Sequence, residues 1–184
     1  YFLLYKMDIQ VKPLSNFDIL EICRKCKLMK PMICKYSEFI TDEYFSDFKQ
    51  NYLCAFILYV YREEPDTFGH WICVMKNIYK PEKLIYFNSG GDKSPDSQFY
   101  KRNLNGQRES ILKIAKKYGY KGIEYNTKSE QIQCDNTDTC GYHCVMRYLT
   151  YFKFDLLTSA AYVKWIKKIT LMCKLPSPDY FVYK

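Results

Sequence analysis

The sequence predicts an α+β fold, in which a central mixed, largely antiparallel sheet is flanked by helices. Short β-branched and aromatic runs occupy the middle of the chain, at residues 51–61, 69–77 and 83–88. The turns between these runs are short, so we expect the three strands to pair as an antiparallel meander. Segments with helical spacing of apolar residues lie on either side, at residues 15–28, 109–118, 140–152 and 158–173.

The elements outside the meander follow from their capping and turn residues. Ser15 can cap the first helix, and Asp18 lies in its first turn. Residues 36–48 are polar and aromatic with mixed signals, and we predict a loop and a short helix there. Residues 89–105 contain glycine and proline and are predicted to be a loop, and residues 121–126 a fourth strand.

The composition is that of one globular domain over residues 1–184. The chain is 48% hydrophobic and 18% aromatic, which is enough to form a core. Its longest apolar run, at residues 53–61, is much shorter than the ~20 residues that span a bilayer, and no signal segment opens the chain. We therefore expect an intracellular protein that is neither secreted nor bound to a membrane.

Nine cysteines are scattered along the chain, an odd number without the spacing of a disulfide framework. Reduced thiols of an intracellular protein are therefore expected. Cys23 and Cys26 have the two-residue gap of a zinc or redox pair. No second pair follows at metal-ligand spacing, and the chain has only two histidines, so no metal site is predicted.

The positive charge is concentrated in the second half of the chain. The net charge is +8, and residues 101–184 alone contain 15 basic and 7 acidic side chains. This excess is typical of a surface that binds DNA or another polyanion. The alternative is that these lysines are solvated side chains on exposed helix faces.

One stretch, residues 133–148 (QCDNTDTCGYHCVMRY), has the pattern of a catalytic loop followed by a helix. Capping residues precede Cys140, and apolar residues follow it with the spacing of a helix that packs inward. A thiol at a helix start faces unpaired N–H groups and the positive end of the helix dipole, which favours the thiolate. Cys140 is therefore a candidate nucleophile, and the alternative is a core cysteine.

A cysteine nucleophile needs a base, and only His70 and His143 offer an imidazole. His143 follows Cys140 by three residues on the same predicted helix, where side chains rarely meet head-on. His70 lies on the second predicted strand, which can face a helix laid across the sheet, and Trp71 after it can shield the imidazole from water. The sequence favours His70.

The remaining parts of such a site are also present. Asn88 ends the neighbouring strand, 18 residues after His70, so one hairpin can bring it beside the imidazole to fix its tautomer. Alternatively, Asn88 caps the turn that follows it. An oxyanion needs donors, and a Gln amide beside the Cys140 N–H would suit. Gln131 and Gln133 are both near enough in sequence.

Four sequence elements in order resemble a known family. They are GHW at residues 69–71, YFNS at 86–89, Gln133, and Cys-Gly at 140–141. This order resembles the cysteine proteases that include adenain, the adenovirus maturation protease, and the proteases of ubiquitin-like proteins. The viral branch is matched more closely by the compact size, by the segment LCA at residues 53–55 before the histidine strand, and by Cys144, four residues after the nucleophile. The resemblance covers residues 50–150.

The resemblance implies a role for each matching residue. His70 would be the base, Cys140 the nucleophile on a central helix, Gln133 the oxyanion donor and Asn88 the orienting residue. Asn88 departs from the family, which usually has Asp or Glu at this place. An amide stabilises a thiolate–imidazolium pair less than a carboxylate does, so activity could be lower, or a nearby acid such as Asp92 could share the role.

The resemblance also implies a substrate and a setting. Relatives cut after small residues, often Gly, so the expected substrates are capsid or core precursor proteins of a DNA virus or virophage. The expected locations are the host cytoplasm or nucleus and the virion. No cofactor is required for the chemistry, and stimulation by DNA or by a basic peptide is implied.

Three other functions remain compatible with the sequence. The first is a protease of ubiquitin-like modifiers, which needs a groove for a folded tag. The second is an acetyltransferase that uses the same three catalytic residue types. The third is a catalytically silent nucleic-acid or capsid-binding protein, whose working part would be the basic surface of residues 101–184.

Overall fold

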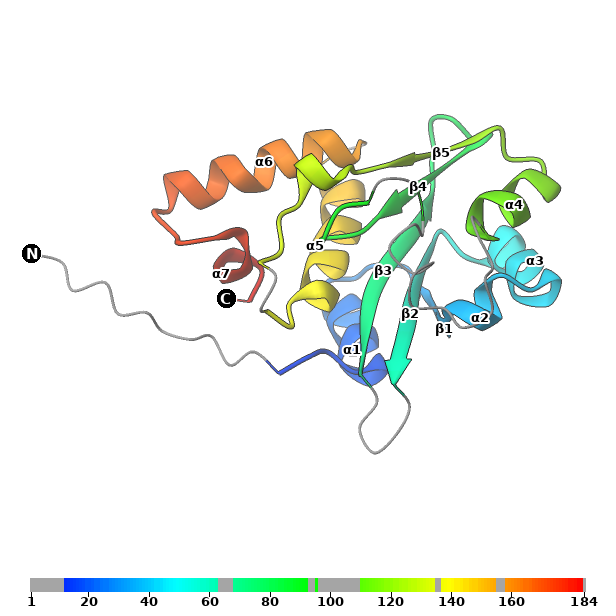
Figure 1. The fold of residues 1–184 in the computed structure, drawn as a ribbon, viewed down its shortest axis with the longest axis horizontal. Coiled ribbons are helices and arrows are strands. Elements are labelled where there is room, and N and C mark those ends of the chain that lie inside the picture. The colour runs from blue at the N-terminus through cyan, green and yellow to red at the C-terminus, as the bar shows by residue number, and fades with distance from the viewer. Residues whose placement is uncertain are drawn as a thin grey trace, which may run out of the picture.

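A mixed five-stranded sheet forms the centre of the structure, and helices cover both of its faces (Figure 1). The structure is a computed structural model that describes residues 12–62, 68–92, 95, 110–134, 137–154 and 158–183. Its elements, in chain order, are α1 (Asn16–Lys25), β1 (Met32–Lys35), α2 (Tyr36–Phe39), α3 (Asp42–Asn51), β2 (Cys54–Arg62), β3 (Phe68–Lys76), β4 (Lys83–Phe87), α4 (Ser110–Lys117), β5 (Gly122–Tyr125), the 3₁₀ helix η2 (Lys128–Glu130), α5 (Cys140–Lys153), α6 (Ser159–Met172) and α7 (Pro178–Tyr183).

The strands follow the order β1-β2-β3-β4-β5 across the sheet. The three central strands, β2 to β4, form the predicted antiparallel meander. Both edge strands are parallel to their neighbours, β1 to β2 and β5 to β4. The α+β class and the mixed sheet are therefore confirmed, with the antiparallel pairs in the middle.

Residues of each central strand alternate between two cores. On β3, Trp71, Cys73 and Met75 point to the face covered by α1, α5, α6 and α7. Ile72 and Val74 point to the opposite face, which α2, α3 and α4 cover. Figure 1 shows the two helix groups on either side of the sheet. Helix α5 consequently lies directly against β3.

The predicted helices are present with small changes of boundary. Helix α1 begins after Ser15, whose hydroxyl accepts from the N–H of Asp18, and the Asp18 carboxylate accepts from the Ser15 N–H, which completes a capping box. It ends at Lys25, three residues before the predicted end, because Lys27 adopts a left-handed conformation with φ of 52°.

Three short elements, β1, η2 and α7, were missed, and one region was wrong. Strand β1 has four residues and directly follows Pro31, so its pattern is too short to detect. Helix α7 has six residues, with Pro178 at its first position. Residues 36–48 were predicted as loop and one short helix, but they form α2 and most of α3, because Phe39, Phe45 and Phe48 pack together at ring-centroid distances of 5.3–5.8 Å.

Some predictions concern residues that the structure does not describe. Most of the predicted loop 89–105, the turn at 63–67 and three basic residues, Lys101, Arg102 and Arg108, lie outside the described residues. That residues 1–184 form one domain stays a prediction for the same reason. Within the described part of the chain, every helix is too short or too polar to cross a membrane.

Candidate active site

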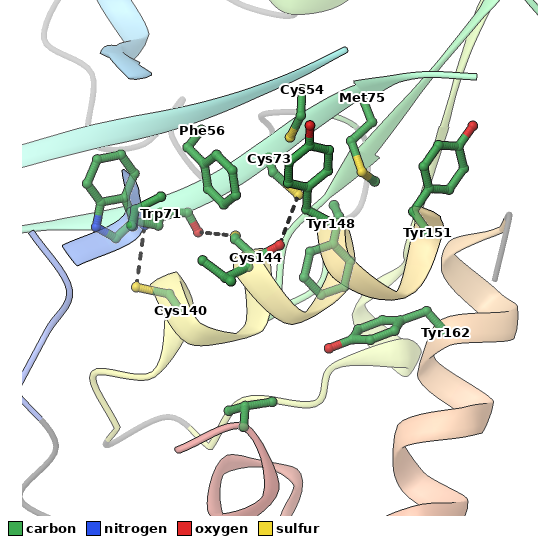
Figure 2. Packing of buried hydrophobic residues seen from close by; sticks show 14 of the residues in the cluster. Cys54, Phe56, Trp71, Cys73, Met75, Cys140, Cys144, Tyr148, Tyr151 and Tyr162 are labelled. Carbon is green, nitrogen blue, oxygen red and sulfur yellow. Dashed lines mark hydrogen bonds between the residues drawn. The ribbon is translucent and has the colours of Figure 1, made fainter. Parts of the chain in front are cut away.

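Helix α5 begins at Cys140, as the sequence predicts, with Thr139 as the N-cap residue. Cys144, Tyr148 and Tyr151 of this helix are buried in the core shared with β3 (Figure 2), and Val145 is buried in the same core. The cysteine thus lies at a junction between loop and helix, and the helix behind it is fixed by packing.

Sulfur hydrogen bonds attach the first two turns of α5 to β3 (Figure 2). The Trp71 N–H donates to Cys140 Sγ at 3.4 Å, and Cys144 Sγ donates to the Trp71 carbonyl, also at 3.4 Å. Strand β4 pairs with β3 only as far as Phe87, which lies opposite Cys73. Beyond that point Trp71 stays paired with Leu58 of β2, and its backbone N–H and carbonyl bond to the thiols of α5.

The N-terminal segment closes one side of this junction. The indole Nε1 of Trp71 donates to the Leu14 carbonyl at 2.9 Å. A Cβ on Gly141 would lie 3.1 Å from Leu14 Cβ and 3.2 Å from Trp71 Cδ1. Glycine after Cys140 therefore lets Leu14 and Trp71 pack against the first turn of α5. As a result, only 6% of the Cys140 surface is accessible to solvent.

Burial controls the protonation of Cys140. It raises the pKa of the thiol above its ordinary value, because a thiolate loses hydration there. The N–H groups of Trp71 and Gly141 lower the pKa of Cys140 without cancelling this effect, and the charge of Asp138 raises it further. The N–H groups at the helix start do favour the thiolate, as expected from the sequence, but burial outweighs them, and the sequence does not show how completely the thiol is enclosed.

His70 and Asn88 meet as the sequence predicts. His70 Nε2 lies 2.8 Å from Asn88 Oδ1. Both residues lie where β3 and β4 separate, since the ladder ends at Cys73 and Phe87 and Asn88 is the next residue of the chain. Gly69 is required just before the histidine, because a Cβ there would lie 2.5 Å from the Tyr59 carbonyl oxygen of β2.

Asp92 is the hydrogen-bond partner of the Asn88 side-chain amide nitrogen. The Asn88 side-chain Nδ2 donates to Asp92 Oδ2 at 2.8 Å. The backbone of Asn88 is fixed by Asn126, whose Oδ1 accepts from the Asn88 N–H at 3.0 Å and whose Nδ2 donates to the Asn88 carbonyl at 2.6 Å. Asn88, Asp92 and Asn126 are all buried. Asn88 therefore contacts His70 directly, and Asp92 contacts Asn88.

Gln133 lies on the same side of the site. Its Oε1 accepts from Ser89 Oγ at 2.5 Å, and its Nε2 donates to the Thr137 carbonyl at 2.5 Å. The backbone N–H of Gln133 also donates to the Ser89 carbonyl at 3.1 Å, which ties it to the residue after Asn88. Gln131, the other candidate, donates to the Gln133 carbonyl at 2.7 Å. Gln133 is thus the amide that faces the loop before Cys140.

A buried acid beside the start of α5, Asp179, was not predicted from the sequence. Asp179 of α7 accepts from His143 Nε2 at 3.0 Å, from the Cys134 N–H at 3.0 Å and from the Thr139 hydroxyl. His143 and Asp179 are fully buried. The only sequence signal was an acid in the first turn of a possible helix, 36 residues from its partner, so nothing in the sequence linked the two.

His143 is therefore part of the core. Burial lowers the pKa of His143 and outweighs the opposite effect of the Asp179 carboxylate. Burial alone would raise the pKa of Asp179, but hydrogen bonds from His143 and Thr139 overcome it, so that pKa lies well below its ordinary value. The pair is thus a neutral imidazole that donates to a carboxylate. Nδ1 of His143 is buried and has no hydrogen-bond partner among the described residues.

We predict that this pair makes the fold sensitive to acid. Below about pH 6.5, where unfolded histidine gains a proton, folded His143 stays neutral, so protonation favours the unfolded chain and stability falls as pH decreases. The depressed pKa of Asp179 acts in the same direction at lower pH. Melting temperatures between about pH 7.5 and about pH 5 should therefore fall more steeply for the native protein than for His143→Gln, whose amide keeps a donor but does not titrate.

His70→Gln is the matched control, since it removes the other histidine, which is only partly buried. Its melting temperature should keep the steep dependence on pH. An equal slope for His143→Gln and the native protein would contradict the assignment of acid sensitivity to His143.

The described lysines of the second half do not share one face. Lys113 and Lys116 lie on α4, which covers one side of the sheet, and Lys164 and Lys168 lie on α6, which covers the other (Figure 1). On α4, Lys117 forms an ion pair with Asp42 at 2.5 Å. Binding of DNA stays a prediction, and these residues do not build one continuous basic surface for it.

Comparisons with known proteins add a fold-level likeness. Neither a family model nor a curated protein sequence matches the chain. Among solved structures, ChlaDub1 from Chlamydia trachomatis is 18% identical with a TM-score of 0.35, over 78% of this chain and 65% of that chain. The Chlamydia trachomatis effector protein Cdu1, solved bound to ubiquitin, is 17% identical with a TM-score of 0.37, over 87% of this chain and 79% of that chain.

The chain thus spans 65% of the length of ChlaDub1. At these identities the likeness concerns the fold alone. The resemblance to viral maturation proteases stays a prediction from the sequence motifs.

Proposed function

We propose that this chain is a cysteine peptidase with Cys140 as nucleophile and His70 as base. One observation supports this most: two adjacent residues of β3, His70 and Trp71, contact Asn88 and Cys140 respectively. His70 Nε2 lies 2.8 Å from Asn88 Oδ1, and the N–H of the next residue donates to Cys140 Sγ. A nucleophile, a base and a residue that orients the base are the requirements of acyl transfer by a thiol.

His70 suits the role of base better than His143. Its Nε2 faces Asn88, so Nδ1 is the ring nitrogen that can take the proton of Cys140. His70 is also partly exposed, so the proton can be passed on to a leaving group. His143 is fully buried, and its Nε2 is bonded to Asp179.

The reaction would proceed through a thioester. Sγ of Cys140 attacks the peptide carbonyl carbon while His70 Nδ1 takes the thiol proton, which gives an oxyanion held by the Cys140 N–H and the Gln133 amide. The C–N bond then breaks, and His70 returns the proton to the departing amine. Water, deprotonated by His70, attacks the thioester carbonyl and releases the acid and the thiol. No cofactor takes part in these steps.

The raised pKa of Cys140 implies when the thiol ionises. A resting thiolate is disfavoured by burial, so the proton moves to His70 as substrate binds and the attack begins. The site therefore depends on its base more strongly than one that holds a thiolate in the free enzyme.

Gln133→Ala should lower kcat by about 10²-fold or more with a small change in KM, because an oxyanion donor acts in the transition state. The amide nitrogen of Gln133 now donates to the Thr137 carbonyl and must turn toward the oxyanion when the substrate is bound. Steady-state kinetics on a fluorogenic peptide measure both constants.

Gln131→Ala is the matched control, because it removes the same amide two residues away. Gln131 bonds to the Gln133 backbone, so this variant should lose much less of kcat. Equal losses of kcat in the two variants would show that the amide of Gln133 has no special role.

Two substrate classes follow from the proposed chemistry. The sequence motifs indicate viral capsid or core precursor proteins cut near glycine, with possible stimulation by DNA, in the infected cell and the virion. A ubiquitin-like modifier is the alternative, and Cdu1, one of the structural neighbours, was solved with ubiquitin bound. We therefore propose to test the modifier first.

A C-terminal electrophile on ubiquitin or on a related modifier tests the alternative directly. Labelling of Cys140, located by peptide mass spectrometry, would assign the modifier class. Cleavage of short glycine-containing peptides without such labelling would assign a maturation protease. If acetyl-CoA is needed for any acyl transfer, the chain is an acetyltransferase. If none of these reagents reacts at Cys140, the site is silent and the peptidase proposal fails.

A further inference from the structure

The amide of Asn88 has only one orientation that fits its neighbours. Its Oδ1 accepts from the Gly90 N–H at 2.9 Å, and a backbone N–H can only donate. Its Nδ2 lies 2.8 Å from Asp92 Oδ2, which can accept this bond. The two contacts together require the oxygen of Asn88 to point to His70 and the nitrogen to point to Asp92.

The orientation of Asn88 determines the tautomer of His70. Because Asn88 Oδ1 is an acceptor, His70 Nε2 at 2.8 Å must carry the proton. Nδ1 then keeps its lone pair and is the atom that can receive the proton of Cys140. A reversed amide would present N–H groups to His70 and would favour the opposite, unproductive tautomer.

Asp92 is itself held in place. Tyr86 donates its hydroxyl to the same Oδ2 atom at 2.6 Å, and Asp92, Asn88 and Tyr86 are all buried. The chain forms a tight turn between Asn88 and Asp92, in which the Gly91 N–H donates to the Asn88 carbonyl at 2.9 Å. Gly91 has a φ of 64°, which favours glycine, and the turn brings Asp92 behind Asn88.

We propose that Asp92 is a positioning residue that fixes the amide of Asn88 and, through it, the proton-accepting tautomer of His70. This inference rests on the proposed peptidase function and adds one residue to it. Asp92 does not touch the substrate or the reacting atoms. It acts as the acceptor at the end of a chain of hydrogen bonds that runs from His70 through Asn88.

The proposal has an unusual consequence for residue 88. An aspartate at this position would direct one carboxylate oxygen to His70 and the other to Asp92, where Asn88 now donates at 2.8 Å. Two carboxylates at this distance repel each other or share a proton, which removes the benefit of the added charge. Asparagine at 88 is therefore the partner that Asp92 requires, and an acid at 88 requires an amide at 92.

A double-mutant cycle tests this consequence. We expect Asn88→Asp to lower kcat/KM by about tenfold or more, because a hydrogen-bonded pair becomes a repulsive one. Asp92→Asn alone should also lower kcat/KM, but by less than Asn88→Asp does, since its amide oxygen still accepts but more weakly than a carboxylate. The exchange Asn88→Asp with Asp92→Asn should return kcat/KM to within about threefold of the native value, because the pair again has one donor and one acceptor.

The decisive result is whether Asp92→Asn raises or lowers kcat/KM when it is added to Asn88→Asp. Asp92→Asn must raise the activity of Asn88→Asp, although it does not raise that of the native protein. A residue that only supports the fold would not give this reversal. If Asp92→Asn leaves the Asn88→Asp variant as slow as before, the proposal is overturned. Melting temperatures of the four proteins show whether any loss is one of folding.

A measurement without turnover separates this proposal from the peptidase function. With ¹⁵N-labelled histidine only two imidazoles contribute, and His143→Gln assigns them. At a pH where His70 is neutral, NMR should show the Nε2–H tautomer in the native protein and a growing Nδ1–H population in Asp92→Ala. An unchanged tautomer in Asp92→Ala would overturn the role of Asp92 even in an active enzyme. The expected change without any turnover would support Asp92 and contradict the peptidase.

Discussion

Replacing Cys140 with alanine is expected to abolish cleavage, with kcat/KM falling by about 10⁴-fold or more, because the attacking atom is lost. The nearest thiol on α5, Cys144, lies one turn away and donates to the Trp71 carbonyl. It cannot replace Cys140 without breaking this contact. The measurement is turnover of a glycine-containing peptide or of a modifier substrate, together with mass spectrometry for an acyl-enzyme that should be absent in the variant.

Cys173→Ala is the matched control, since it makes the same chemical change on an exposed thiol at the end of α6. It should keep full activity. Simple alkylation is a poor substitute for this test, because exposed Cys134 and Cys173 should react with iodoacetamide before buried Cys140 does. Turnover by Cys140→Ala equal to that of Cys173→Ala would end the proposal that Cys140 is the nucleophile.

The sequence was most informative where periodicity and chain order decide the structure. β-Branched and aromatic runs at residues 51–61, 69–77 and 83–88, joined by short turns, gave the meander, and helical spacing gave α5 with Cys140 at its first position. The 18-residue separation of His70 and Asn88 correctly placed them together, because a hairpin of that length returns the chain to the same end of the sheet.

The sequence was least informative about contacts that depend on burial. The link between His143 and Asp179 joins α5 to a six-residue helix, and neither the helix nor the pair leaves a pattern in the chain. The burial that outweighs the effect of the helix start on the pKa of Cys140 could not be predicted for the same reason. Its local position at a helix start was visible, whereas the enclosure by Leu14 and Trp71 was not.

His70→Ala should lower kcat by about 10³-fold at neutral pH, since general-base catalysis typically contributes 10²- to 10⁴-fold. The remaining activity should have a different dependence on pH. Without a base, Cys140 must ionise by itself, and burial places its pKa above the ordinary value. The kcat of His70→Ala should therefore continue to increase with pH in the alkaline range, where the kcat of the native enzyme is already constant. Initial rates from about pH 6 to about pH 10 test this.

His143→Gln separates the two histidines. His143 is buried against Asp179, so this variant should lose stability but keep most of the kcat of the native protein at temperatures where it is folded. The opposite result, with His143→Gln inactive and His70→Ala active, would make His143 the base. The carboxylate of Asp179 would then be the residue that orients it, and the contact between His70 and Asn88 would be structural, because the two imidazoles cannot both take the proton of one thiol.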